Sequence, residues 1–138
     1  MTTNLTIIDD ALREINVISE IDSASAEQGK FCLRRLNQMM EVWRENGADI
    51  GYFAQDTTTD TIPIPDWTEL GVTAALAIVI APTYSATVSA ELLLTARIAA
   101  NMITRKSLAE RQQGANMSHL PAGSGNRYTS GRNILTDS

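Results

Sequence analysis

The longest apolar run of the chain lies within residues 66–82, which read DWTELGVTAALAIVIAP. Asp66 and Glu69 have the spacing of a capping box, in which two side chains three positions apart satisfy the free N–H groups at a helix start. The apolar residues that follow fall on every side of the helix, which is typical of a helix enclosed by protein. Pro82 cannot continue a helix, so the helix is predicted to end before it. We therefore expect residues 66–81 to form the centre of the core.

The same run bears on whether the chain crosses a membrane. Its apolar part, Val72 to Ala81, is interrupted by Thr73 and is much shorter than the ~20 residues needed to span a bilayer. The first residues, MTTN, lack the basic start and apolar stretch of a secretory signal. We expect no membrane anchor and no membrane partner.

An amphipathic helix is predicted near the N-terminus. Its apolar residues recur at helical spacing, and they are Leu5, Ile8, Leu12 and Ile15. Thr3 or Asn4 can cap this helix. The charged residues are expected on the opposite, solvent-facing side, and they are Asp9, Asp10, Arg13 and Glu14.

A second helix of about twenty residues is predicted between Ser25 and Asn46. Ser25 and Gln28 form a second capping box, and Gly47 can adopt the left-handed conformation that closes a helix. The apolar stripe is expected in the core, and it contains Cys32, Leu33, Leu36, Met39, Met40 and Trp43. Cys32 is therefore expected to be an inert buried thiol.

Residues 51–65 are rich in threonine and proline, which disfavours a helix. They are predicted to form an extended arm or a short hairpin that projects from the bundle, with Tyr52 and Phe53 opposite Ile62 and Ile64. Two interpretations of this arm stay open with equal weight: contact with a neighbouring subunit, and a plain surface loop.

A fourth helix is predicted to begin near Thr87 or Ser89 and to end at Gln112-Gln113-Gly114. Basic residues mark its outward side, namely Arg97, Arg105 and Lys106. Its inward side is expected to carry Leu92, Ala96, Ala99, Met102, Ile103 and Leu108.

With 138 residues the chain has the size of one domain. The predicted fold is all-α, a small bundle of about four helices with a short extended arm and a long irregular C-terminal tail. We divide it into a helical part, residues 1–113, and a tail, residues 114–138. The tail is rich in Gly, Asn and Ser with few apolar residues, so it is expected to become ordered only against a partner.

The chain has a net charge of −5, and its charged residues are unevenly distributed along the sequence. Residues 1–104 hold six basic and 14 acidic side chains, whereas residues 105–138 hold five basic and two acidic ones. The negative body disfavours a protein that coats nucleic acid or regulates genes by binding DNA, and we expect no sequence-specific nucleic-acid partner. The basic end is either a plain soluble terminus or a segment that docks on an acidic partner surface.

Few residues suit catalysis. Cys32 is the only cysteine and His119 the only histidine, which excludes an intramolecular disulfide and a cysteine-based zinc site. Because His119 lies in the predicted tail, it is not expected to act with Cys32 as a nucleophile and base. Glu41 and Glu45 have a spacing that would suit a glycoside hydrolase but that occurs on most exposed helices. We therefore expect no enzyme, and no catalytic, cofactor-binding or metal-binding residue.

Three further motifs carry weaker signals. Gly123-Ser124-Gly125 lacks the lysine and the strand-to-helix setting of a phosphate-binding loop. The pairs Arg34-Arg35 and Arg105-Lys106 lack the interleaved aromatic residues that single-stranded nucleic acid would require. We expect both pairs to be solvent-exposed or to form salt bridges.

Several short motifs together resemble those of one protein family. In chain order they are Ala11-Leu12-Arg13, Met39-Met40 with Trp43, Gly47, Gly51-Tyr52, Ala81-Pro82 with Tyr84, and Leu120-Pro121-Ala122-Gly123-Ser124-Gly125-Asn126. In this order they resemble the tail accessory factors of short-tailed bacteriophages, also called packaged-DNA stabilisation or head-completion proteins. The tail motif is the most specific of them.

The resemblance implies a structural role in the virion, at the junction of head and tail. Twelve copies would assemble as a ring on the portal protein after DNA packaging, close the head, and receive the tail needle and the tailspike or fibre proteins. Assembly would take place in the host cytoplasm. On this interpretation the tail binds the portal, and the residues expected to do so are Leu120, Pro121, Gly123, Gly125, Asn126, Tyr128 and Arg132.

The alternative from another class is a peptidoglycan hydrolase of the phage tail. Some family members are described as having a cell-wall hydrolase activity. No catalytic residue can be matched in this chain, so the connector is the leading hypothesis.

Overall fold

The computed structural model describes residues 1–119, and the side chains as far as residue 112. Its helices are α1 (Asn4–Glu14), α2 (Ala26–Glu45), α3 (Glu69–Ile80) and α4 (Ala90–His119), with short 3₁₀ helices η1 (Asp66–Thr68) and η2 (Ala81–Tyr84) on either side of α3. Residues 1–119 contain no β-strand beyond an isolated bridge between Thr3 and Thr61. The all-α prediction is confirmed.

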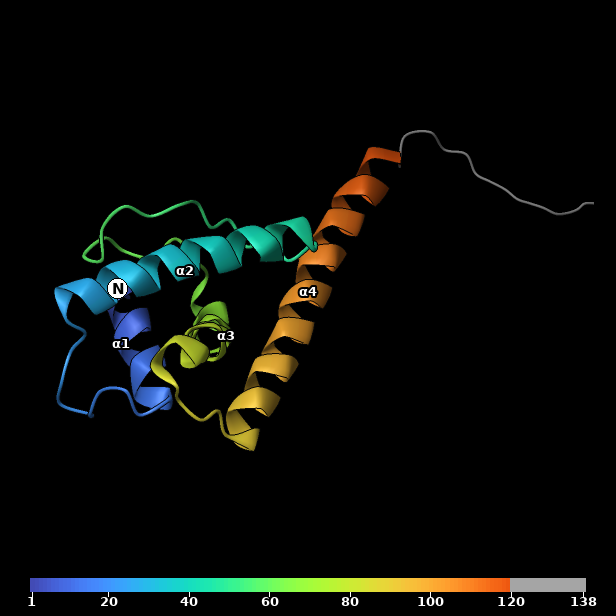
Figure 1. The fold of residues 1–138 in the computed structure, drawn as a ribbon. Coiled ribbons are helices and arrows are strands. Elements are labelled where there is room, and N and C mark those ends of the chain that lie inside the picture. The colour runs from blue at the N-terminus through green and yellow to red at the C-terminus, as the bar shows by residue number, and fades with distance from the viewer. Residues whose placement is uncertain (120–138) are drawn as a thin grey trace, which may run out of the picture. The chain divides into compact units, whose positions relative to one another are not determined.

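The first compact unit of the chain is Met1–Ser107, and a second unit begins at Leu108. Within the first unit, α2 lies across α1 and α3, and the first part of α4 packs beside them (Figure 1). The predicted division into residues 1–113 and 114–138 stays a prediction.

The core lies around α3, as predicted. Fully buried side chains come from all four helices, and they include Ile8, Leu12, Cys32, Leu36, Val72, Leu76, Ala77, Ile80 and Ile103. Two residues of α3 differ from the expectation of a fully enclosed helix, because Leu70 is 68% exposed and Val79 is 41% exposed. The two residues are nine positions apart and therefore lie on opposite sides of α3, so part of the helix is exposed on each of these sides.

One helical stretch, Asp66–Tyr84, is long and apolar enough to span a membrane by length and composition alone. Half of it is buried inside the protein. A buried core helix meets the same criteria, and the buried residues of α3 place this stretch in the core of the first unit.

Two of the three predicted helix starts with named caps are confirmed. The Thr3 side chain accepts a hydrogen bond from the Thr6 backbone N–H of α1. Ser25 and Gln28 form the predicted capping box at the start of α2, and α2 ends at Asn46-Gly47, with Gly47 at a φ of 97°.

The capping box predicted for Asp66 and Glu69 is wrong. Pro65 to Thr68 fold into a 3₁₀ turn in which the Thr68 hydroxyl donates to the Pro65 carbonyl over 2.6 Å. Glu69 instead accepts a hydrogen bond from the Thr2 hydroxyl at 2.9 Å. The Glu69 carboxylate therefore binds Thr2, a residue distant in the sequence, and not the backbone N–H at the start of its own helix.

Residues 51–65 are extended, as predicted, but they do not project from the bundle or form a hairpin. The backbone N–H groups of Asn4 and Leu5 donate to the carbonyls of Asp60 and Thr58, at 2.9 and 2.8 Å. The first N–H groups of a helix have no partner within the helix. This segment supplies acceptors for them, and it therefore lies against the start of α1.

Buried polar side chains hold the same segment in place. Asn4 is fully buried, and its amide donates to the Gln55 side chain at 3.0 Å and to the Thr57 carbonyl at 2.9 Å. Asn37 of α2 donates to the Gln55 carbonyl and accepts from the Gln55 N–H and the Tyr52 hydroxyl. We call residues 52–62 the strap, because they form hydrogen bonds with both α1 and α2.

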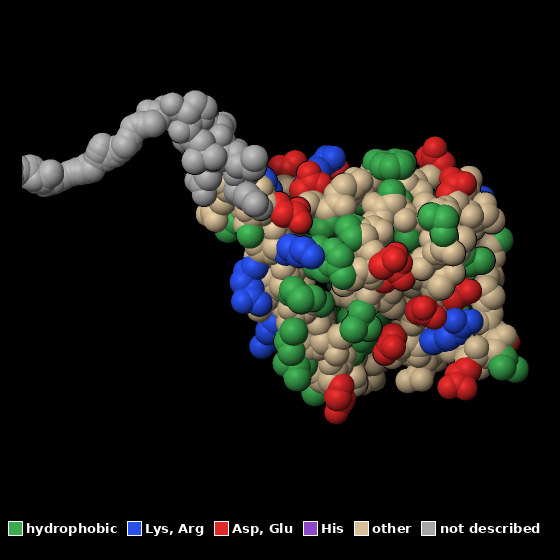
Figure 2. Space-filling view, turned by 180° about the vertical axis from the view of Figure 1, so that it is seen from behind, with side chains coloured by type: hydrophobic (Ala, Val, Ile, Leu, Met, Phe, Trp, Pro, Cys, Tyr) green, Lys and Arg blue, Asp and Glu red, His purple; other side chains and the backbone are tan. Residues whose placement is uncertain are grey.

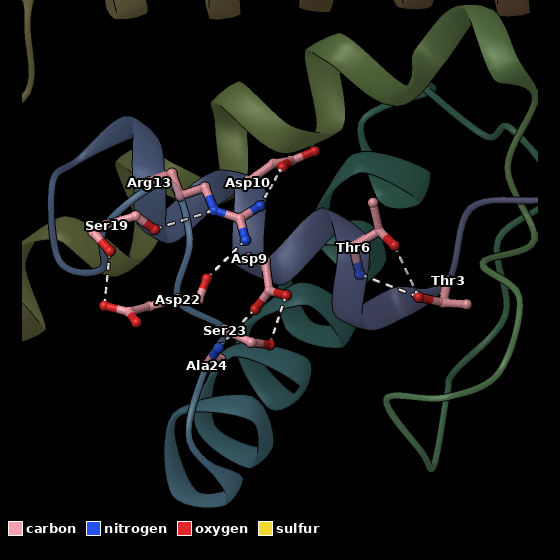
Figure 3. A network of polar contacts seen from close by, with 9 residues as sticks. All are labelled: Thr3, Thr6, Asp9, Asp10, Arg13, Ser19, Asp22, Ser23 and Ala24. Atoms are coloured by element: carbon pink, nitrogen blue, oxygen red, sulfur yellow. Dashed lines mark hydrogen bonds and ion pairs between the residues drawn. The ribbon is translucent and has the colours of Figure 1, made fainter.

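The connection between α1 and α2 is also polar (Figure 3). Arg13 donates to the carbonyls of Ser19 and Asp22 and pairs with Asp10 at 3.1 Å. Asp9, which was predicted to face solvent, is buried because its carboxylate accepts from the Ser23 hydroxyl and the Ala24 N–H, both at 2.8 Å. Helical periodicity alone could not show that a polar loop covers this residue.

Helix α4 begins where it was predicted and ends later. The Ser89 hydroxyl accepts from the Leu92 N–H at 3.1 Å. The predicted end at Gln112-Gln113-Gly114 is wrong, because α4 continues to His119. A single glycine costs a helix only about 1 kcal/mol relative to alanine, and the neighbouring Gln113 and Ala115 favour helix.

Candidate interaction surfaces

The residues predicted to bind the portal lie outside the described residues. They are Leu120, Pro121, Gly123, Gly125, Asn126, Tyr128 and Arg132. The Gly123-Ser124-Gly125 motif lies there too, and the side chain of His119 is also not described. The assignment of this segment to portal binding therefore stays a prediction.

Three residues of the two basic pairs contact aromatic rings of the chain itself, namely Arg34, Arg35 and Lys106. The guanidinium groups of Arg34 and Arg35 lie 5.6 and 5.3 Å from the centroid of the Phe31 ring. The Lys106 ammonium lies 4.3 Å from the centroid of the Trp67 ring. Arg34, Arg105 and Lys106 are exposed, as expected, and Arg35 is half-buried. Cation–π contacts in addition hold Arg34, Arg35 and Lys106 against the surface of the domain.

Cys32 is fully buried, as predicted. Burial raises the pKa of its thiol to about 11, and a hydrogen bond with Tyr84 partly opposes this shift. The pKa of the Tyr84 phenol is raised to about 12, mainly by burial. The charge of Cys32 and the hydrogen bond with Cys32 add smaller increases. A thiol in this state is a poor nucleophile at neutral pH.

The carboxylate pair considered for hydrolysis lies on the outer side of α2. Glu41 forms an ion pair with Arg44 of the next turn, and both side chains are about half exposed. Glu45 is exposed as well. Among the described residues no group of three or more His, Cys, Asp or Glu side chains could hold a metal ion.

Helix α4 presents an apolar face that no other part of the first unit covers. Leu94 and Ile98 are 56% and 58% exposed, and Leu93 and Met102 are nearly half exposed. Arg97 and Arg105 are exposed on the same side of the helix. We call these six residues the α4 outer face; Figure 2 shows the basic side chains gathered along α4 with apolar side chains beside them.

An open groove of about 880 Å³ lies between α1 and the start of α3. Its lining includes four acidic side chains, Asp10, Glu14, Glu20 and Glu69. Arg13 is the only basic residue in the lining, and Asp10 pairs with it. We call this feature the acidic groove; the exposed Leu70 lies on its wall, so the groove has an apolar as well as an anionic part.

A second hollow of about 160 Å³ continues the acidic groove toward the start of α4. Glu14, Leu70 and Thr73 line both hollows, and the second adds Glu91. The acidic surface is therefore continuous over α1, α3 and the first turn of α4.

Neither surface was predicted from the sequence. Leu94, Ile98 and Met102 recur every four residues, and this spacing would have indicated a second apolar stripe on α4 beside the inward one. The inward prediction was right for Leu92, Ala99 and Ile103 but wrong for Met102 and Leu108, which are 44% and 45% exposed. No local pattern indicates the acidic groove, because its residues come from separate parts of the chain.

The described geometry has the features of a protein that contacts other proteins, and comparison with known families agrees. Residues 1–134 match the family model described as P22 tail accessory factor. The chain belongs to this family. No match was found among curated proteins.

Membership confirms the resemblance drawn from the short motifs. A tail accessory factor is a component of the phage virion, so the chain has a structural role there. For a tail accessory factor, the α4 outer face and the acidic groove are surfaces available to other virion proteins.

Proposed function

We propose that this tail accessory factor is a head-to-tail connector. Twelve copies assemble as a ring on the portal after DNA packaging, close the head, and receive the tail needle and the tailspike or fibre proteins. The observation that carries the proposal is the family match, which runs from the helical unit through residue 134 and so includes most of the predicted tail.

The described residues support a structural role in a ring. The first unit is small and built around tightly packed α-helices, and it leaves apolar and charged surfaces uncovered on different elements. A ring requires each copy to contact others and the portal at the same time, so weak contacts add up through multivalency.

We propose that residues 120–132 attach the chain to the portal. Their composition favours ordering on a partner, which permits contact over a large surface. Leu120 and Tyr128 supply apolar anchors, whereas Gly123 and Gly125 permit close approach of the backbone.

Truncation after His119 tests this attachment. The shortened chain keeps all of the described helices, so it is expected to give the same far-ultraviolet circular dichroism per helical residue and the same urea midpoint. Binding to purified cognate portal rings, measured by co-sedimentation, is expected to fall at least tenfold. Undiminished binding would refute the assignment.

Point variants test whether particular side chains of this segment contact the portal. The double variant Leu120→Ala with Tyr128→Ala is expected to weaken portal binding at least tenfold, because it removes both apolar anchors. Ser130→Ala lies in the same segment and is expected to bind like the unaltered chain.

We further propose that the chain does not hydrolyse peptidoglycan. The exposure of Glu41 and Glu45 supports this, because a hydrolytic acid requires an environment that raises its pKa. Turbidity of a cell-wall suspension is expected to stay constant with the protein present. Clearing that disappears in one of the variants Glu41→Gln or Glu45→Gln would instead establish the enzyme.

A further inference from the structure

The α4 outer face is too apolar and too basic for a plain solvent-exposed helix surface. Leu94 and Ile98 lie one turn apart and are each more than half exposed. Residues 90–107 carry three basic side chains and one acidic one, whereas residues 1–89 carry five basic and 13 acidic ones. The helix is therefore a positive element on a strongly negative unit.

The acidic groove has the opposite properties. Glu14 and Glu20 have no salt bridge among the described residues, and Glu69 accepts only a hydrogen bond from Thr2. The exposed side chain of Leu70 offers an apolar contact beside these carboxylates. The groove thus complements a surface that combines leucine, isoleucine and arginine side chains.

We propose that the α4 outer face of one copy docks in the acidic groove of the next copy. Leu94 and Ile98 contact Leu70 of the neighbour, while Arg97 and Arg105 pair with its Glu14 and Glu20. The contact joins two different surfaces, and such heterologous contacts generate rings when the rotation closes. The inference rests on the proposed ring and assigns the surfaces that join its subunits.

Charge reversal on either surface tests the contact. The double variants Arg97→Glu with Arg105→Glu and Glu14→Lys with Glu20→Lys each place like charges opposite one another. Each alone is expected to raise the half-saturating concentration for filling cognate portal rings at least tenfold, measured by native mass spectrometry. Bound copies are expected to be scattered over partly filled rings instead of filling them completely.

Mixing the two double variants is the sharper test. The reversed α4 outer face of one variant then meets the reversed groove of the other, and the two unaltered surfaces also meet. A ring with an even number of copies can alternate the variants, so complete rings are expected to return. The quadruple variant, with both surfaces reversed in one chain, is expected to fill rings like the unaltered chain.

Lys30→Glu with Arg34→Glu on α2 is the matched control, because it changes the net charge as much as reversal on α4 does. It is expected to fill rings like the unaltered chain. Equal filling by all variants, or an equal loss in the control, would overturn the inference while leaving the connector role intact. Absence of any portal binding by the unaltered chain would refute the connector role and the inference with it.

Discussion

Gly71 sets how closely α3 and α4 approach each other. A Cβ atom at this position would lie 2.7 Å from the Ala99 Cβ and 3.2 Å from the Ile103 Cδ1. Both neighbours are buried, so neither can move aside without disturbing the packing of α4. The small side chains on both helices therefore fix the position of the α4 outer face relative to the core.

Gly71→Ala is accordingly expected to destabilise the protein by about 1–3 kcal/mol, the usual cost of an overpacked core. Gly29→Ala is the matched control, because a Cβ there would lie 3.4 Å from the Thr58 Cγ2, an ordinary contact. Alanine favours helix over glycine by about 1 kcal/mol, so the control should be neutral or stabilising. Urea unfolding compares the two, and equal stabilisation by both would show that α3 and α4 are not in tight contact.

The raised pKa values of buried groups make the protein sensitive to alkali. Cys32, with a pKa of about 11, and Tyr84, with a pKa of about 12, keep their protons in the folded state to a higher pH than in the unfolded chain. The unfolded state therefore binds fewer protons above about pH 9, and the free energy of unfolding falls as the pH rises from there toward 11.

Urea unfolding at pH 7.5 and pH 10 measures this loss. The unaltered chain is expected to lose more stability between these two values than Cys32→Ala, which no longer has the thiol to ionise. The variant can be less stable at both pH values, so only the difference between them is compared. An identical difference in both proteins would contradict the burial of the thiol.

At the scale of elements, the strap is the feature that stabilises the bundle away from α4. Its backbone carbonyls accept hydrogen bonds from the free N–H groups at the start of α1. It also forms hydrogen bonds with Asn37 of α2. Its buried member Ile62 also donates its N–H to the Thr2 carbonyl at 3.0 Å. A segment without a helix or a strand of its own thus holds two helices together.

Asn37→Ala is expected to destabilise the protein by about 2–3 kcal/mol, because it removes three hydrogen bonds of about 1 kcal/mol each. Hydrogen exchange at the Gln55 amide should accelerate at the same time, since that N–H loses its acceptor. Gln38→Ala changes the exposed neighbouring residue and should alter stability by less than about 0.5 kcal/mol. Unchanged exchange at Gln55 would contradict the role of the strap.

The elements also show what sequence patterns can predict. Periodicity and capping residues predicted the starts of α1, α2 and α4 and the end of α2, because these depend on neighbours in the sequence. Three contacts depend on residues outside the helix concerned, so no local pattern indicated them. They are the loop that covers Asp9, the hydrogen bond from Thr2 to Glu69, and the hydrogen bonds between the strap and the start of α1. The acidic groove was missed for the same reason, whereas the α4 outer face had a visible spacing.

At the scale of the whole molecule, the buried core and the exposed charged and apolar surfaces have different roles. The core holds the helices together, the acidic groove and the α4 outer face remain uncovered, and the family match extends beyond the described residues to residue 134. In the proposed connector, the uncovered surfaces join copies to one another and the final segment joins them to the portal.

Electron cryo-microscopy of the full chain bound to its cognate portal measures this most directly. We expect one added ring beneath the portal, with the helical units side by side and density for residues 120–132 running along the portal surface. No added ring, or a ring that touches the portal only through residues 1–119, would contradict the account.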